Sequence, residues 1–142
     1  MIQRDFIKRQ LEELGRAIAK VISDMQKLKV AGNVNDGIRL AQETLKSTFD
    51  LDMENLQSLP IDKFAETLIT EKNLSIVHLN YLGNLLCATA EMFDQKKDTA
   101  KAKKLYQKAL AIFHYVDHNE RTFSVERNNK IEAIESYLGI IN

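Results

Sequence analysis

The apolar residues between positions 2 and 30 recur at alternating steps of four and three. These residues are Ile7, Leu11, Leu14, Ile18, Val21, Met25 and Leu28. The spacing predicts one long helix with a single apolar stripe, since such residues return to the same helical face. The stripe is long enough either to pack inside the monomer or to form a homodimer seam through this first helix. Gly15 costs this helix about 1 kcal/mol relative to alanine unless a partner helix approaches closely there.

The remaining chain carries six further helical segments, and no useful length of it alternates with the period of two that a strand requires. The expected segments run from Asn35 or Asp36 to Phe49, Leu51 to Leu59, Ser58 or Pro60 to Ile69, Asn73 or Ser75 to about Asp94, Asp98 or Thr99 to Val116, and Thr122 or Ser124 to Ile141. The short polar residues that begin these segments are the expected helix caps. The helix over 75–94 is apolar on two sides, so we expect it to lie between neighbours. The predicted fold class is all-α, with antiparallel helical hairpins in a single domain over residues 1–142.

A spaced pattern of small and aromatic residues marks the segment 86–113. Its positions are Leu86, Ala90, Phe93, Ala102, Tyr106, Ala109 and Leu110. Here small alanines would let two helices approach, and aromatic rings would fill the space between them. The pattern resembles the tetratricopeptide repeat, which implies a pair of antiparallel helices. The sequence departs from the family at Leu86, where tryptophan is frequent, and at His114, where the repeat often ends in proline.

Shifting that pattern back by 65 residues gives a second, weaker match. The matching residues are Val21, Met25, Leu28, Gly37, Ala41, Thr44 and Leu45. The resemblance then implies a TPR-like hairpin from the first two helices, inserted short helices over 50–72, and a C-terminal capping helix. The layout is also similar to small, uncharacterised bacterial helical-repeat proteins. That likeness implies an architecture rather than an activity, and any two amphipathic helices joined by a short loop match loosely.

The composition excludes several classes of protein. The 142 residues are 44% hydrophobic, enough for a folded domain, and 20 basic residues balance 20 acidic ones, so no global field attracts nucleic acid or anionic lipid. The single cysteine, Cys87, excludes an intrachain disulfide, and its apolar neighbours predict a buried, inert thiol. Without a signal-like N-terminus or a membrane-length apolar run, the chain is expected to be cytoplasmic. No phosphate-binding glycine loop or nucleophile motif is present, so neither a cofactor nor enzymatic activity is expected.

Neither of the two candidate metal sites in this sequence has a complete set of ligands. His114 and His118 lie four residues apart on one predicted helix, but zinc needs three or four ligands. Two histidines in the last turn of a helix are also explained by the helix dipole. Asp50, Asp52 and Glu54 imitate the start of a calcium loop, yet the loop's glycine and final glutamate are missing. These acids are better explained as the cap and first turn of a short helix.

Four lysines form a possible basic stripe on the penultimate helix. They are Lys97, Lys101, Lys104 and Lys108, and their spacing places all four on one face. Such a ridge can bind phosphate or an acidic partner. Because no aromatic residues interleave for base stacking, an ordinary solvated face explains the lysines better than nucleic-acid binding does.

The resemblance to tetratricopeptide repeats also implies a place for a protein partner. In that family ligands lie against exposed positions of the first helix of each pair, and the matching positions here are Asn84, Cys87, Ala88, Glu91 and Asp94. Chaperone-binding members carry lysine and asparagine where Cys87 and Glu91 stand, so a carboxylate clamp is not expected. The acids Glu91 and Asp94 favour a cationic or mixed partner. Alternatively, these residues face the inserted helices and bind nothing.

The sequence therefore predicts a non-enzymatic protein–protein interaction or scaffold module whose partner is not identified. The alternatives are a metal- or small-ligand-binding protein that uses His114 and His118, and a nucleic-acid-associated factor that uses the lysine stripe.

Overall fold

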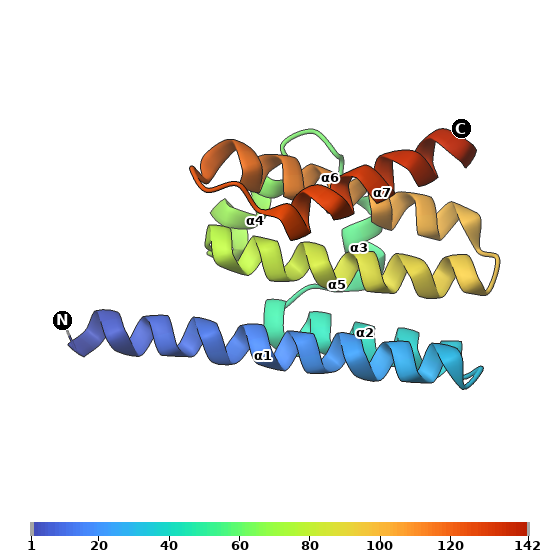
Figure 1. The fold of residues 1–142 in the computed structure, drawn as a ribbon, viewed down its shortest axis with the longest axis horizontal. Coiled ribbons are helices and arrows are strands. Elements are labelled where there is room, and N and C mark those ends of the chain that lie inside the picture. The colour runs from blue at the N-terminus through green and yellow to red at the C-terminus, as the bar shows by residue number, and fades with distance from the viewer. Residues whose placement is uncertain (1, 142) are drawn as a thin grey trace.

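The computed structural model of the chain describes residues 2–141, which form seven helices and no strand (Figure 1). In chain order they are α1 (Ile2–Val30), α2 (Val34–Phe49), α3 (Met53–Ser58), α4 (Phe64–Lys72), α5 (Ile76–Gln95), α6 (Thr99–Asn119) and α7 (Val125–Ile141). This confirms the all-α class. Among the same residues, no helix combines the length and apolar character needed to cross a membrane.

Three helix starts match residues that the sequence offered as caps. The Ser75 hydroxyl accepts the backbone N–H of His78 at the start of α5, Asp98 accepts that of Lys101 in α6, and Ser124 accepts that of Arg127 in α7. Each bond satisfies a donor that the first helical turn leaves without an intrahelical partner. In each case the structure selects one of the two neighbouring residues that the sequence offered as the helix start.

The starts of α2 and α4 were predicted wrongly. Helix α2 begins at Val34, so Asp36 lies inside the first turn, where it pairs with Arg39 at 3.0 Å instead of capping. Helix α4 begins at Phe64 and not near Pro60, because Lys63 adopts a left-handed conformation with φ of 59°. A residue in that conformation interrupts a right-handed helix, so the chain turns before α4 starts.

The acidic segment after α2 divides between two roles. Asp52 caps α3 by accepting the backbone N–H of Glu54 at 3.1 Å, as expected for a helix start. Asp50 instead follows α2 in a left-handed conformation, where its carboxylate pairs with Lys72 at 3.3 Å and Lys46 at 3.6 Å. These lysines lower the pKa of Asp50.

The α5–α6 pair is the centre of the fold, with α1 and α2 packed on α5 and with α3, α4 and α7 packed on α6. Helices α1 and α2 run antiparallel, α5 and α6 run antiparallel, and α5 contacts α1, α2 and α6 (Figure 1). In Figure 1, α1, α5 and α7 lie on the near side of the molecule, with α2 and α6 behind them. The short helices α3 and α4 pack against α6. The prediction that the helix over 75–94 lies between neighbours is therefore confirmed.

Small residues occupy the close contacts of this core. Ala90 of α5 and Ala102 and Ala109 of α6 are fully buried. A Cβ atom added at Gly83 would lie 2.6 Å from the ring of Phe113, so this glycine admits a phenylalanine of α6. Gly37 has the same role for Met92, whose sulfur would lie 3.1 Å from an added Cβ.

The first helix departs from its predicted burial at its N-terminal end. Ile18 and Met25 are buried as expected, but Ile7 is 49% exposed and neighbouring Phe6 is 56% exposed. In Figure 1 the start of α1 projects beyond the other helices. The apolar stripe is thus correct as a helical face, but its first turns lack a neighbour within the described chain.

Candidate functional site

One face of α5 lies between α1 and α7 and is partly accessible on either side of the buried Cys87. It carries Asn80, Asn84, Cys87, Glu91 and Asp94 at steps of four, three, four and three, which define one helical stripe. The last four are predicted partner positions. Asn80 was missed, although it stands one turn before Asn84 and shares its spacing. We call this surface, with its walls on α1 and α7, the groove.

The polar residues of this stripe are held by the two flanking helices. Each accepts one side-chain hydrogen bond from α1 or α7. The donor and acceptor pairs are Arg127 Nη1 to Asn80 Oδ1 at 3.4 Å, Lys130 Nζ to Asn84 Oδ1 at 2.9 Å, Gln26 Nε2 to Glu91 Oε2 at 2.9 Å, and Tyr137 Oη to Asp94 Oδ1 at 2.9 Å. These bonds orient the side chains before any partner arrives.

Two parts of the predicted surface need correction. Ala88 is buried with 4% exposure and Cys87 with 8%, so neither presents a free side chain to a partner. The alternative that the stripe faces the inserted helices is also wrong. Helices α3 and α4 pack on α6, whereas Asn84 and Glu91 bond to α7 and α1.

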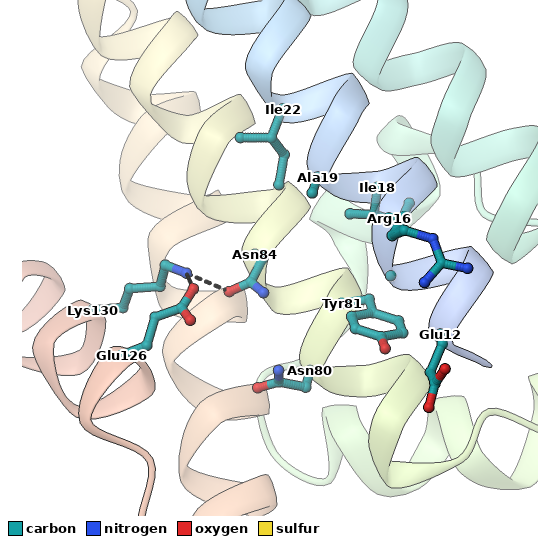
Figure 2. Close-up of a pocket in the computed structure, with 11 residues that line it drawn as sticks. Glu12, Arg16, Ile18, Ala19, Ile22, Asn80, Tyr81, Asn84, Glu126 and Lys130 are labelled. Carbon is teal, nitrogen blue, oxygen red and sulfur yellow. Dashed lines mark hydrogen bonds and ion pairs between the residues drawn. The ribbon is translucent and has the colours of Figure 1, made fainter. Parts of the chain in front are cut away.

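A cleft of about 610 Å³ opens at the end of the groove nearest the start of α5 (Figure 2). Its apolar wall comes from α1 and consists of Ile18, Ala19 and Ile22. Facing this wall are Asn80, Tyr81 and Asn84 of α5, with Glu126 and Lys130 of α7 beside them. The cleft therefore combines an apolar surface with polar groups, as ligand sites commonly do.

The charged groups of the cleft balance in sign. Glu12 and Arg16 lie on the α1 side, and Glu126 and Lys130 lie on the α7 side. Lys130 donates to Glu126 at 2.8 Å, and this hydrogen bond lowers the pKa of the Glu126 carboxyl. A ligand with mixed or no net charge is favoured by such a lining.

At the other end of the groove, Glu91 and Asp94 are bound by side chains of α1 and α7, which reduces the negative charge that they present. Glu91 accepts the hydrogen bond from Gln26, and the Lys29 ammonium lies 3.6 Å from the same carboxylate oxygen. Asp94 is bound by Tyr137, whose pKa is raised to about 12, first by burial and then by this hydrogen bond. The groove thus has no concentrated negative charge that would select a purely cationic partner.

Arg127 fixes the α7 wall of the groove. Its side chain is 5% exposed, and its guanidinium donates to Asp117, to Glu120 at 2.9 Å and to Asn80 at 3.4 Å. The three acceptors come from α6, from the turn after it and from α5. The sequence contained no signal for this cluster, because its members are separated along the chain and become neighbours only when α7 folds back.

The structure shows the surroundings of the single cysteine and of the histidine pair. Burial raises the pKa of Cys87 to about 12, so its thiol is protonated near neutral pH. His114 and His118 are exposed near the end of α6. In the described part of the chain, no three histidine, cysteine, aspartate or glutamate side chains are close enough to hold a metal ion together.

The lysine stripe does not form as predicted. Lys97 lies in the turn between α5 and α6 with φ of 65°, and Lys108 is 2% exposed. The Lys108 ammonium lies 4.6 Å from the ring centre of Phe64 in α4 and has no hydrogen-bond partner within residues 2–141. Only Lys101 and Lys104 of the four remain exposed on α6, because α4 covers the next turn.

Comparison of the chain with protein-family models, curated proteins and solved structures finds no match to any of them. The functional interpretation therefore rests on the residues of the groove themselves.

Proposed function

We propose that this protein is a non-enzymatic protein–protein interaction module that holds a segment of its partner in the groove between α1, α5 and α7. The observation that supports this most directly is the open stripe of α5, whose polar side chains are already oriented by both flanking helices. Groups that are fixed before binding lose little conformational entropy when a partner arrives.

The arrangement of helices supports a tetratricopeptide-like interpretation of this groove. The pairs α1–α2 and α5–α6 are antiparallel, and α7 follows as a third helix on the near side, in the place of a capping helix (Figure 1). Gly37 and Thr44 of α2 are buried at the two small positions of the weaker sequence match. In this interpretation α3 and α4 are an insertion on the side away from the groove.

The partner segment is proposed to carry apolar side chains together with balanced charge. Ala19 and Ile22 offer an accessible apolar wall. Two charges of each sign lie at the cleft, on Glu12, Arg16, Glu126 and Lys130. Exclusively basic or acidic segments would leave two of these charges opposite a like charge, which lowers affinity.

Selection of peptides on the full chain tests the proposal. A random library of 12-residue peptides is panned on the wild-type protein, and the enriched peptides are measured against Ala19→Glu and Ala17→Glu. Both positions are exposed on α1, but only Ala19 lines the cleft. We expect at least a tenfold loss of affinity for Ala19→Glu and little change for Ala17→Glu. Failure to enrich any peptide, or equal effects of both variants, would contradict the proposal.

The projecting start of α1 supports a second proposed contact, with another copy of this chain. Phe6 and Ile7 are about half exposed there, in continuation of the stripe that is buried farther along the helix. Arg4, Lys8 and Arg9 precede Glu12 and Glu13 in sequence, so an antiparallel pairing of two such segments brings opposite charges together. Sedimentation velocity should show concentration-dependent dimers that Ile7→Glu abolishes. A monomer at every accessible concentration contradicts this contact.

A further inference from the structure

Two asparagines in the cleft, one helical turn apart on α5, each accept a hydrogen bond from a cation of α7. The side-chain oxygens of Asn80 and Asn84 accept from Arg127 and Lys130 of α7. No hydrogen bond from either amide nitrogen occurs among residues 2–141. In Figure 2 the Asn84 nitrogen lies on the side of the amide away from Lys130.

The orientation of both amides is determined by their cationic partners. Turning the Asn84 amide by 180° would place its NH₂ group against the Lys130 ammonium, and two donors repel each other. The same holds for Asn80 and the Arg127 guanidinium. Arg127 is itself held by Asp117 and Glu120, so the α7 cation cannot move away to relieve such a contact. Both NH₂ groups are therefore available to a ligand.

The spacing of these donors matches one kind of ligand. Residues four apart on a helix are separated by about 6 Å along its axis. In an extended peptide, successive carbonyls on the same side repeat about every 6.6 Å, because alternate residues point the same way. The carbonyls of a helical ligand are already used within the helix, so they match less well.

We propose that the cleft binds an extended peptide segment in which two carbonyl groups, two residues apart, accept hydrogen bonds from Asn80 and Asn84. This inference rests on the proposed function and specifies the backbone conformation of the partner. Side chains of the segment then contact Ala19 and Ile22 on the opposite wall, which are the accessible apolar residues there. Recognition of the backbone sets the position of the segment, whereas the apolar wall and the four charges select its side chains.

Substitutions at the two asparagines test this arrangement. Asn80→Asp and Asn84→Asp lose the NH₂ group and keep an acceptor for Arg127 and Lys130, but they add a charge. Asn84→Leu loses the NH₂ group without adding charge, but it also removes the acceptor of Lys130. The charge-matched control is Asn129→Asp at an exposed position of α7. With the tightest-binding peptide from the library as the probe, we expect each of the three cleft variants to weaken binding about three- to tenfold, as for loss of one hydrogen bond. The control should bind like wild type.

The conformation of the bound peptide provides an independent readout. Carbon-13 chemical shifts of the labelled peptide, bound to the full chain, should be those of extended backbone. Helical shifts overturn the inference but leave the proposed function intact. A second result would have the same meaning: the three cleft variants bind the peptide as tightly as wild type, while Ala19→Glu still loses affinity for it. If no peptide binds, the inference and the proposed function both fail.

Discussion

Tyr81 of α5 lies directly against Gly15 of α1, and its hydroxyl donates to the Leu11 carbonyl oxygen at 3.1 Å. A Cβ atom at Gly15 would lie 2.6 Å from that hydroxyl oxygen. The glycine that looked unfavourable inside a long helix is thus the point at which α5 approaches α1. Because Tyr81 and Gly15 also line the cleft, this contact sets the position of the α1 wall.

Substitution of Gly15 by alanine is expected to destabilise the protein by up to about 2 kcal/mol. The new methyl group must displace the Tyr81 ring, and overpacking of this kind outweighs the gain of about 1 kcal/mol in helix propensity. The free energy of unfolding in urea measures the change. Gly139→Ala is the matched control, because nothing lies within 4 Å of a Cβ there, and it should be neutral or slightly stabilising. Equal gains for both variants would show that Tyr81 does not need the glycine.

Lys108→Met should stabilise the protein by about 1–2 kcal/mol at pH 7. The substitution removes a buried ammonium that lacks a hydrogen-bond partner, and this gain exceeds the lost interaction with the Phe64 ring. Urea unfolding provides the measurement. Lys104→Met, at an exposed position one turn earlier on α6, should change the free energy of unfolding by less than about 0.5 kcal/mol. If Lys108→Met destabilises the protein instead, the buried ammonium contributes favourably to folding and the prediction is wrong.

The advantage of Lys108→Met should also depend on pH. Burial lowers the pKa of Lys108 below its ordinary 10.5, so between these two values the unfolded chain binds more protons than the folded chain. The penalty of the wild type is complete below the lowered pKa and declines as the pH rises towards 10.5. The difference in unfolding free energy between variant and wild type should therefore shrink from pH 7 to pH 10. A constant difference would contradict this assignment.

Arg127→Gln should cost about 1–3 kcal/mol of stability and loosen the α7 wall of the groove. Stability falls because Asp117, Glu120 and Asn80 lose the donor that they share. The loss stays moderate because water still reaches the two carboxylates. Thermal unfolding measures the stability, and amide hydrogen exchange in α7 measures the loosening. Arg121→Gln, at an exposed position in the neighbouring turn, should leave both unchanged. Equal effects at the two positions would show that the cluster has no special role.

Cys87 should react at least 100-fold more slowly with iodoacetamide at pH 8 in the folded protein than in urea. Burial both blocks access and raises the pKa of the thiol to about 12, which leaves very little thiolate. Mass spectrometry of the alkylated protein provides the rates. A Cys87→Ser, Ala133→Cys variant, whose thiol is exposed on α7, should react rapidly in the folded state. Rapid alkylation of native Cys87 would contradict its burial.

The residues expected in the groove came from the resemblance to the tetratricopeptide repeat. Four of them, Asn84, Cys87, Glu91 and Asp94, follow steps of three and four, so they share one helical face. Which helices cover such a face depends on segments far away in sequence, so local spacing does not predict it. Lys108 is an example: its neighbours in sequence give no sign that Phe64 of α4 will bury it.

The sequence by itself determined the seven helices, most of their caps and the small residues at which they pack, because these depend on contacts within one or two helical turns. Tertiary structure alone decided that α3 and α4 cover α6, that Arg127 joins three segments, and that α7 binds the amide oxygens of Asn80 and Asn84. Those features depend on where distant helices meet in space. Local periodicity specifies only which face each helix buries.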